Sequence, residues 1–257
     1  MSEQLSLQLT AIPDIPLIKV GDDLNRILLK AIDQTGLALE DGDVLVLAQK
    51  IVSKAEGCFA DLSSIVPSER AYELAEKTNK DPRLVEVVLS ESTEVVRHAP
   101  NIFIVAHRLG FVSANAGIDR SNVDSEPNSD HVLLLPKDPD RSCALLRQKL
   151  EAATGKNIGI IINDSHSRAW RVGSVGLALG VSGVPAVIDM RGRTDLFDRT
   201  LLGTEIGIAD EISAAASILM GQANEGRPAI LVRGLPYSLS EGNAQELIRP
   251  KETDLFR

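Results

Sequence analysis

Short apolar runs rich in β-branched residues, each ending abruptly on polar side chains, most constrain the fold of this chain. The clearest are DVLVLAQK, GIIINDSHSR, PAVIDMRGR and PAILVRG. Such runs are typical of buried strands, and in α/β sheets the polar residues after a strand lie beside a crevice where ligands bind. The alternative, for any single strand, is that these polar residues merely begin a loop.

The remaining periodicity predicts a mixed α and β chain. Strands are expected over 5–12, 43–49, 101–106, 131–135, 157–163, 184–189 and 228–233. Helical spacing fits 22–34, 67–78, 81–91, 139–153 and 208–221. Ser68 is a plausible N-cap, and the polar stretch 119–130 is typical of a surface loop.

Composition excludes several classes of protein. The 257 residues are 44% hydrophobic and can bury a sizeable core. The net charge of −9 argues against nucleic acid or an anionic membrane as the main partner. Cys58 and Cys143 are too few for a disulfide framework, and we find neither a signal sequence nor a run of about 18 apolar residues. We therefore expect a cytoplasmic protein.

Five arginines, with no lysine among them, gather in the stretch 164–199. They are Arg168, Arg171, Arg191, Arg193 and Arg199. The planar guanidinium pairs bidentately with carboxylate or phosphate, so the cluster indicates an anion pocket. The alternative is internal pairing with Asp189, Asp195 and Asp198.

Two aspartates and a serine are candidate ligands of a hard cation. Asp164 and Ser165 follow the most apolar strand, and Asp119 lies in SANAGIDRSN. Mg²⁺ and Mn²⁺ prefer such oxygen ligands, although a turn or helix cap would explain each aspartate as well. His166 has no second histidine or cysteine at a zinc spacing, so zinc is not expected.

Nucleotide motifs of the common kinds are absent. No G-x-x-x-x-G-K-[ST] and no G-x-G-x-x-G after a strand occurs, which excludes a P-loop or Rossmann site. Lys50 and Lys54 are four residues apart after DVLVLAQ, and one of them could touch phosphate. The glycines in VGSVGLALGVSG are spaced for close packing or for backbone approach to a ligand.

Taken together, a set of segments resembles the coenzyme F420-0:gamma-glutamyl ligase family over nearly the whole chain. The segments are EDGDVLVLAQKIVSKAEG, VPSERAYELAEKTNKDPRLVEVVLSES, GFVSANAGIDRSNV, LLLPKDPDRSCALLRQKL, IGIIINDSHSRAWRVGSVGLALGVSGV, GRTDLFDRTL, IADEISAAASILMGQANEG and PAILVRG. Several motifs in one order with compatible spacing are more specific than any one of them.

The resemblance implies an α+β fold in one domain, 1–257, with two intertwined subdomains and a homodimer that holds nucleotide and metal between its subunits. It implies a GTP-dependent ligase that joins L-glutamate to the phospholactyl carboxylate of coenzyme F420-0 through an acyl phosphate. Addition of further glutamates to the product is an extension of that activity. The implied ions are Mg²⁺ or Mn²⁺, and K⁺. The rivals are an amino-acid ligase for another phosphorylated carboxylate and a non-catalytic nucleotide-binding regulator.

The resemblance also implies roles for particular residues. The residues expected around the nucleotide are Ile15, Pro16, Gln49, Lys54, Asn122, Met220, Gly221, Gln222 and Gly226. The expected metal ligands are Asp119, Asp164, Ser165 and Gln222. For the acidic substrates, charge alone suggests Arg168, Arg171, Arg191 and Arg193.

The chain departs from the family pattern at Ser167 and Ala169, where relatives often have glycine and proline, at Asp198, often glycine, and at Gln49, often serine. The changes at 167 and 169, and at 198, bear on the choice of precursor. A charge at Asp198 would disfavour a phosphorylated substrate if it faced the pocket. The alternative is that Asp198 lies on the surface and pairs with a neighbour of Arg199.

Overall fold

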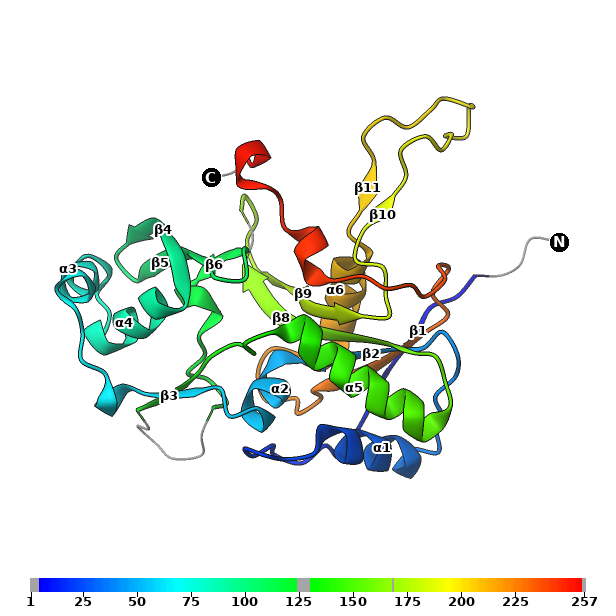
Figure 1. Ribbon diagram of the computed structural model, residues 1–257, viewed down its shortest axis with the longest axis horizontal. Coiled ribbons are helices and arrows are strands. Elements are labelled where there is room, and N and C mark those ends of the chain that lie inside the picture. The colour runs from blue at the N-terminus through cyan, green and yellow to red at the C-terminus, as the bar shows by residue number, and fades with distance from the viewer. Residues whose placement is uncertain (1–4, 124–129, 168, 256–257) are drawn as a thin grey trace.

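The central element of the protein is a five-stranded sheet in the order β1-β12-β2-β8-β9 (Figure 1). The computed structural model describes residues 5–123, 130–167 and 169–255. The strands, in sheet order, are Gln8–Ala11, Ala229–Arg233, Val44–Ala48, Gly159–Ser167 and Ser174–Ser182. β2 and β8 pair in parallel, and the other neighbours are antiparallel. This mixed sheet confirms the α+β class.

Helices cover both faces of this sheet, because its central strands are apolar on both sides. Successive strand residues point to opposite faces, so Leu45 and Leu47 join one buried cluster and Val44 and Val46 join another. The first cluster packs under three helices: α1 (Leu24–Gln34), α2 (Gln49–Ala55) and α5 (Pro139–Thr154). The second packs under α6 (Ile208–Met220).

A second, smaller core is built by one continuous stretch of chain between α2 and α5, at the left of Figure 1. It contains the sheet β4-β5-β6 and the helices α3 and α4. Their bounds are Ser92–Ala99, Ile102–His107, Val112–Ala114, Glu69–Thr78 and Pro82–Ser90. Beside it, β3 (Phe59–Asp61) pairs with β7 (His131–Leu133).

Short elements complete the fold. A long hairpin, β10 (Ile188–Asp189) and β11 (Glu205–Ile206), projects from the main body (Figure 1). The 3₁₀ turns η1 to η4 are Leu62–Ser64, Asn115–Gly117, Ala244–Leu247 and Lys251–Thr253. Within the described residues, no helix is both long and apolar enough to cross a membrane.

The expected elements are largely confirmed. All five expected helices form, and the Ser68 hydroxyl caps α3 by accepting from the Ala71 amide at 3.2 Å. Six of the seven expected strands lie where the apolar runs place them. Of the expected surface loop at 119–130, residues 124–129 lie outside the described part of the chain.

The expected strand at 184–189 is wrong over most of its length, because only Ile188–Asp189 is paired. Pro185 has no amide hydrogen to donate to a neighbouring strand. β9 was not predicted as a strand, since its glycines weaken the pattern of apolar residues. β4 was missed because its sequence, STEVVRHA, contains too many polar residues to read as a buried run.

The glycines of β9 serve close packing. A Cβ on Gly180 would lie 2.5 Å from the backbone carbonyl atoms of Pro139, at the start of α5. A Cβ on Gly176 would lie 2.5 Å from the Ser213 carbonyl oxygen on α6. Both helices therefore approach the strand more closely than any side chain on it would permit.

Gly180→Ala is expected to lower the free energy of unfolding by about 1–3 kcal/mol, the usual cost of overpacking, because the obstructing atoms are backbone. Urea denaturation measures the change. Gly203→Ala is the matched control, since nothing lies within 4 Å of a Cβ built there. Equal unfolding midpoints for the two variants would contradict the packing role of Gly180.

Candidate functional site

A cavity of about 400 Å³ opens at the carboxyl ends of the parallel strands β2 and β8. The amino end of β12 lies beside them, because β12 runs antiparallel to β2. The lining residues come from 15–18, 48–54, 121–122, 163–165 and 220–228. This is the crevice expected from apolar strands that end on polar residues.

The residues expected around the nucleotide all line this cavity. They are Ile15, Pro16, Gln49, Lys54, Asn122, Met220, Gly221, Gln222 and Gly226. Three of the four expected metal ligands, Asp164, Ser165 and Gln222, line it as well. The structure thus brings together side chains more than 200 positions apart in the sequence.

Asp119, the fourth expected ligand, is tied to the cavity by the first turn of α2. Its Oδ2 accepts a hydrogen bond from Gln49 Nε2 at 2.6 Å and pairs with Lys50 Nζ at 2.6 Å. The Ser53 hydroxyl in turn donates to Gln49 Oε1 at 2.9 Å, which fixes the orientation of the amide. Gln49, where many relatives have serine, is therefore a buried partner of Asp119.

An unusual turn sets the position of Asp119. Asn115, Ala116 and Gly117 have φ values of 51°, 55° and 67°, in the left-handed region. Left-handed backbone costs roughly 1–2 kcal/mol for a residue with a Cβ, so the surrounding structure must hold this turn. After it, the backbone of Asp119 exchanges two hydrogen bonds with Leu133, at 3.0 and 2.9 Å.

The electrostatics of the site favour a cation. Burial raises the pKa of the Asp119 carboxyl above its ordinary value, and the charge of Asp164 raises it further, while Lys50 and Gln49 act in the opposite direction. Two carboxylates thus repel each other in a largely buried place. A divalent cation between them would relieve that repulsion.

The candidate donors fit Mg²⁺ or Mn²⁺ by their chemistry. Asp119, Asp164, Ser165 and Gln222 all offer oxygen, which these ions prefer to nitrogen or sulfur. Within the described ranges, no group of three or more His, Cys, Asp and Glu side chains is arranged to hold a metal. The remaining ligands of an ion here would be water or phosphate oxygens, as is usual for Mg²⁺.

Lys54 and Asn122 link three segments that line the cavity. Lys54 Nζ donates to the Asn122 carbonyl oxygen at 2.6 Å. Asn122 Nδ2 donates to the Ala223 carbonyl oxygen at 3.0 Å, so α2, the 121–122 turn and the segment after α6 are linked. Asn122 itself has φ of 57°, a conformation that asparagine tolerates better than most residues.

The described arginines of the stretch 164–199 do not line this cavity, and they lie on two hairpins. Arg171 is exposed between β8 and β9, and Arg168 lies outside the described residues. Arg191 pairs with Asp189 at 2.7 Å and with Glu205 at 3.2 Å, and it lowers the pKa of Asp189 to about 2. The alternative of internal pairing therefore holds for Arg191. Arg193 is exposed on the same hairpin.

The backbone conformation at position 198 explains why aspartate can stand where relatives often have glycine. Asp198 has φ of 58° in the turn of the β10–β11 hairpin, where its amide donates to the Asp195 carbonyl oxygen at 3.2 Å. Glycine adopts this conformation freely, and aspartate is among the residues that tolerate it. The side chain is exposed and does not line the cavity.

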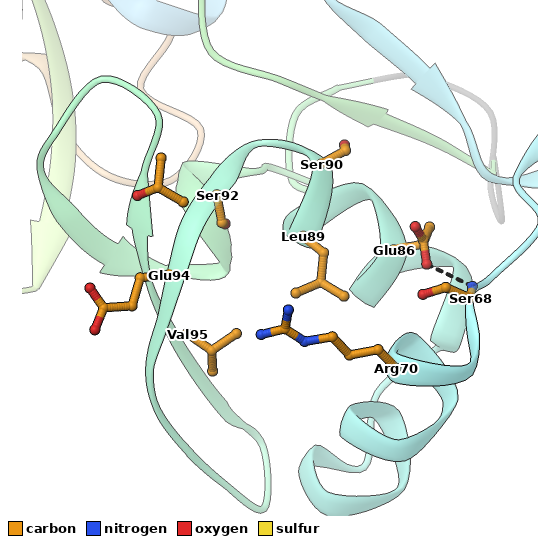
Figure 2. Close-up of a pocket in the computed structure, with 9 residues that line it drawn as sticks. Ser68, Arg70, Glu86, Leu89, Ser90, Ser92, Glu94 and Val95 are labelled. Atoms are coloured by element: carbon orange, nitrogen blue, oxygen red, sulfur yellow. Dashed lines mark hydrogen bonds between the residues drawn. The ribbon is translucent and has the colours of Figure 1, made fainter.

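A separate cavity of about 270 Å³ lies between α3, α4 and β4 (Figure 2). Figure 2 shows the Arg70 guanidinium extending across it toward Val95, while Glu86 accepts from the Ser68 amide at 2.7 Å. None of the residues expected in the nucleotide or metal site lines this cavity.

Two contacts of the candidate metal ligands were not predicted from the sequence. Lys50 was considered for phosphate, and the structure also shows it paired with Asp119. His166 was considered only as a zinc ligand, and its Nε2 lies 2.9 Å from Asp164 Oδ2. The spacing of Asp164 and His166 could have predicted their contact, because residues two apart on a strand share a face.

The chain belongs to the F420-0:gamma-glutamyl ligase family. The sequence model of that family matches residues 13–234, which include every stretch that lines the cavity. The resemblance carried by the sequence segments is therefore confirmed, and the chain is a member of a ligase family.

Individual relatives agree over almost their full length. The coenzyme F420:L-glutamate ligase of Methanothermobacter thermautotrophicus is 43% identical over 255 residues, which cover 98% of this chain and 100% of the relative. That of Methanocaldococcus jannaschii is 43% identical over 244 residues, covering 95% and 94%. That of Methanococcus maripaludis strain S2 is 46% identical over 244 residues, covering 95% of both chains.

Proposed function

We propose that this protein is a cytoplasmic, GTP-dependent ligase that forms a gamma-glutamyl amide bond between L-glutamate and the phospholactyl carboxylate of coenzyme F420-0. The observation that carries the proposal is the single cavity shared by all nine residues expected around the nucleotide and by three of the expected metal ligands. Family membership and the names of the relatives supply the substrates.

The reaction proceeds in two displacements. An oxygen of the precursor carboxylate attacks the γ-phosphorus of GTP, and the bond from that phosphorus to the β-phosphate oxygen breaks, releasing GDP. The amine of glutamate then attacks the carbonyl carbon of the acyl phosphate. Orthophosphate leaves, and the ammonium proton passes to solvent. Phosphoryl transfer of this kind depends on positioning and charge stabilisation, without a covalent side-chain nucleophile.

The residues of the cavity have separate tasks in this scheme. The segments 15–18 and 220–228 enclose the nucleotide, and Lys54 contributes a positive charge to its phosphates. Asp119, Asp164, Ser165 and Gln222 would hold Mg²⁺ or Mn²⁺, which neutralises phosphate charge when bound. Lys50 keeps the Asp119 carboxylate oriented. Binding of K⁺ is also part of the proposal, and it is supported by the family resemblance alone.

A homodimer is part of the proposal. Large apolar side chains are exposed on the two hairpins: Trp170 and Val172 on one, and Leu196, Phe197 and Leu202 on the other. Exposed apolar groups gathered on projecting segments are typical of protein–protein contacts. Contact with a second copy through these hairpins would bring Arg171 and Arg193 close to a partner, where they could hold the acidic substrates.

The direct test is mass spectrometry of F420-0 incubated with the protein, GTP, Mn²⁺ and glutamate. Each glutamate added raises the product mass by one glutamyl increment, and the spectrum counts how many are added. An unchanged precursor mass, with bound GTP retained, would favour a nucleotide-binding regulator. Incorporation only with a different phosphorylated carboxylate would favour the rival ligase.

The acyl phosphate route makes a separate prediction about products. GDP and orthophosphate should form in step with the amide, and precursor labelled with ¹⁸O in its carboxylate should deliver one labelled oxygen to orthophosphate. Both follow because the carboxylate oxygen becomes the bridge to phosphorus. Release of GMP and pyrophosphate, with the label in GMP, would instead establish an acyl-nucleotide intermediate.

A further inference from the structure

The buried imidazole of His166 lies against the carboxylate of Asp164. Its Nε2 is 2.9 Å from Asp164 Oδ2, and the two residues are 5% and 9% exposed. In the tautomer that carries its proton on Nε2, the imidazole donates a hydrogen bond to this carboxylate oxygen. Both side chains lie on β8, two residues apart, and therefore share a face of the strand.

Phe111 packs against the His166 ring and fixes its orientation. The ring centroids are 5.0 Å apart with planes at 47°. Phe111 also stacks on His107, with centroids 4.8 Å apart and planes at 7°. His107 Nδ1 accepts from the Leu109 amide at 3.0 Å, and its Nε2 lies 3.6 Å from Glu91 Oε2. The aromatic contacts thus connect His166 to β5 through His107, and to the first buried cluster, against which Phe111 packs.

Open space next to His166 makes this anchoring necessary. A cavity of about 240 Å³ is lined by His166, Phe111, Asp210 and residues near the end of the chain. A ring without a firm contact could turn into that space and leave Asp164. The hydrogen bond and the contact with Phe111 act together to prevent this.

We infer that His166 is a positioning residue for Asp164, and that Phe111 keeps His166 in place. The inference rests on the proposed function, in which Asp164 is a ligand of the divalent cation. By holding Oδ2, the imidazole fixes the orientation of the carboxylate that would bind the ion. A ligand fixed in advance loses less side-chain entropy when the ion binds.

The test is calorimetric titration of the full chain with Mn²⁺. His166→Leu should raise the Kd for Mn²⁺ about 10- to 100-fold, the range typical of lost partners of metal ligands. His166→Gln should recover most of the affinity, because its Nε2 can donate from a similar place. His98→Leu, on the exposed face of β4, is the matched control and should leave the Kd unchanged. Thermal unfolding checks that each variant is folded.

The outcomes separate this inference from the proposed function. An unchanged Kd in Asp164→Asn would overturn the metal site itself. Lost affinity in Asp164→Asn with an unchanged Kd in His166→Leu would overturn only the positioning role, as would equal losses in the leucine and glutamine variants. If His166→Leu does not fold, Phe111→Leu replaces it. That variant should weaken Mn²⁺ binding, and an unchanged Kd would overturn the inference.

Discussion

Replacing Asp119 or Asp164 by asparagine is expected to lower kcat for glutamyl transfer about 10²- to 10³-fold, the scale seen when one electrostatic stabiliser of a transition state is lost. The two carboxylates are close enough to interact, since the charge of Asp164 acts on Asp119. Either change removes a negative charge that would hold the divalent cation. Turnover measured across a Mn²⁺ titration tests this.

The double variant should be little worse than the worse single variant. Residues that act as one unit are strongly non-additive, because the first loss already disables the site. Asp33→Asn, exposed on α1, is the control and should leave turnover unchanged. Independent losses that add in log rate, with an unaltered dependence on Mn²⁺, would mean that the two aspartates do not share an ion.

Folding should survive these changes. Since burial and the neighbouring charge raise the pKa of Asp119, its ionised form is the one that the fold disfavours. A neutral asparagine removes that penalty, although Lys50 loses its partner. We therefore expect Asp119→Asn to have a thermal midpoint equal to or above that of the parent chain at pH 7, and a large drop would point to a structural role of Asp119 instead.

The location of the cavity was predictable because it depends on a simple pattern. DVLVLAQK and GIIINDSHSR each end an apolar run on polar residues, and parallel pairing of β2 with β8 aligns those ends. The segment around Gln222 could not be placed by pattern. It reaches the cavity because α6 crosses the sheet and leads into β12, which is a property of the whole fold.

The features that the sequence did not predict depend on contacts between segments that are far apart along the chain. Asp119 and Asp164 are 45 positions apart, and the left-handed turn at 115–117 that sets Asp119 has no signal beyond Asn and Gly. Of the described arginines, Arg171 lies between β8 and β9, whereas Arg191 and Arg193 lie between β10 and β11. Spacing along a chain cannot distinguish an anion pocket from the surface pair formed by Arg191 and Asp189.

Lys54→Met is expected to raise the Kd for GTP about 10- to 100-fold, because a hydrogen bond to a charged group contributes about 1.5–3 kcal/mol and each 1.4 kcal/mol is tenfold. Stability should fall by at most about 1.5–3 kcal/mol, because the bond that Lys54 Nζ makes to the Asn122 carbonyl oxygen also involves a charged group. Lys77→Met, exposed on α3, controls for the loss of a helix lysine. Calorimetry gives both affinities. If Lys54→Met binds GTP normally while its thermal midpoint falls, the lysine serves to hold the 121–122 turn and has no part in phosphate binding.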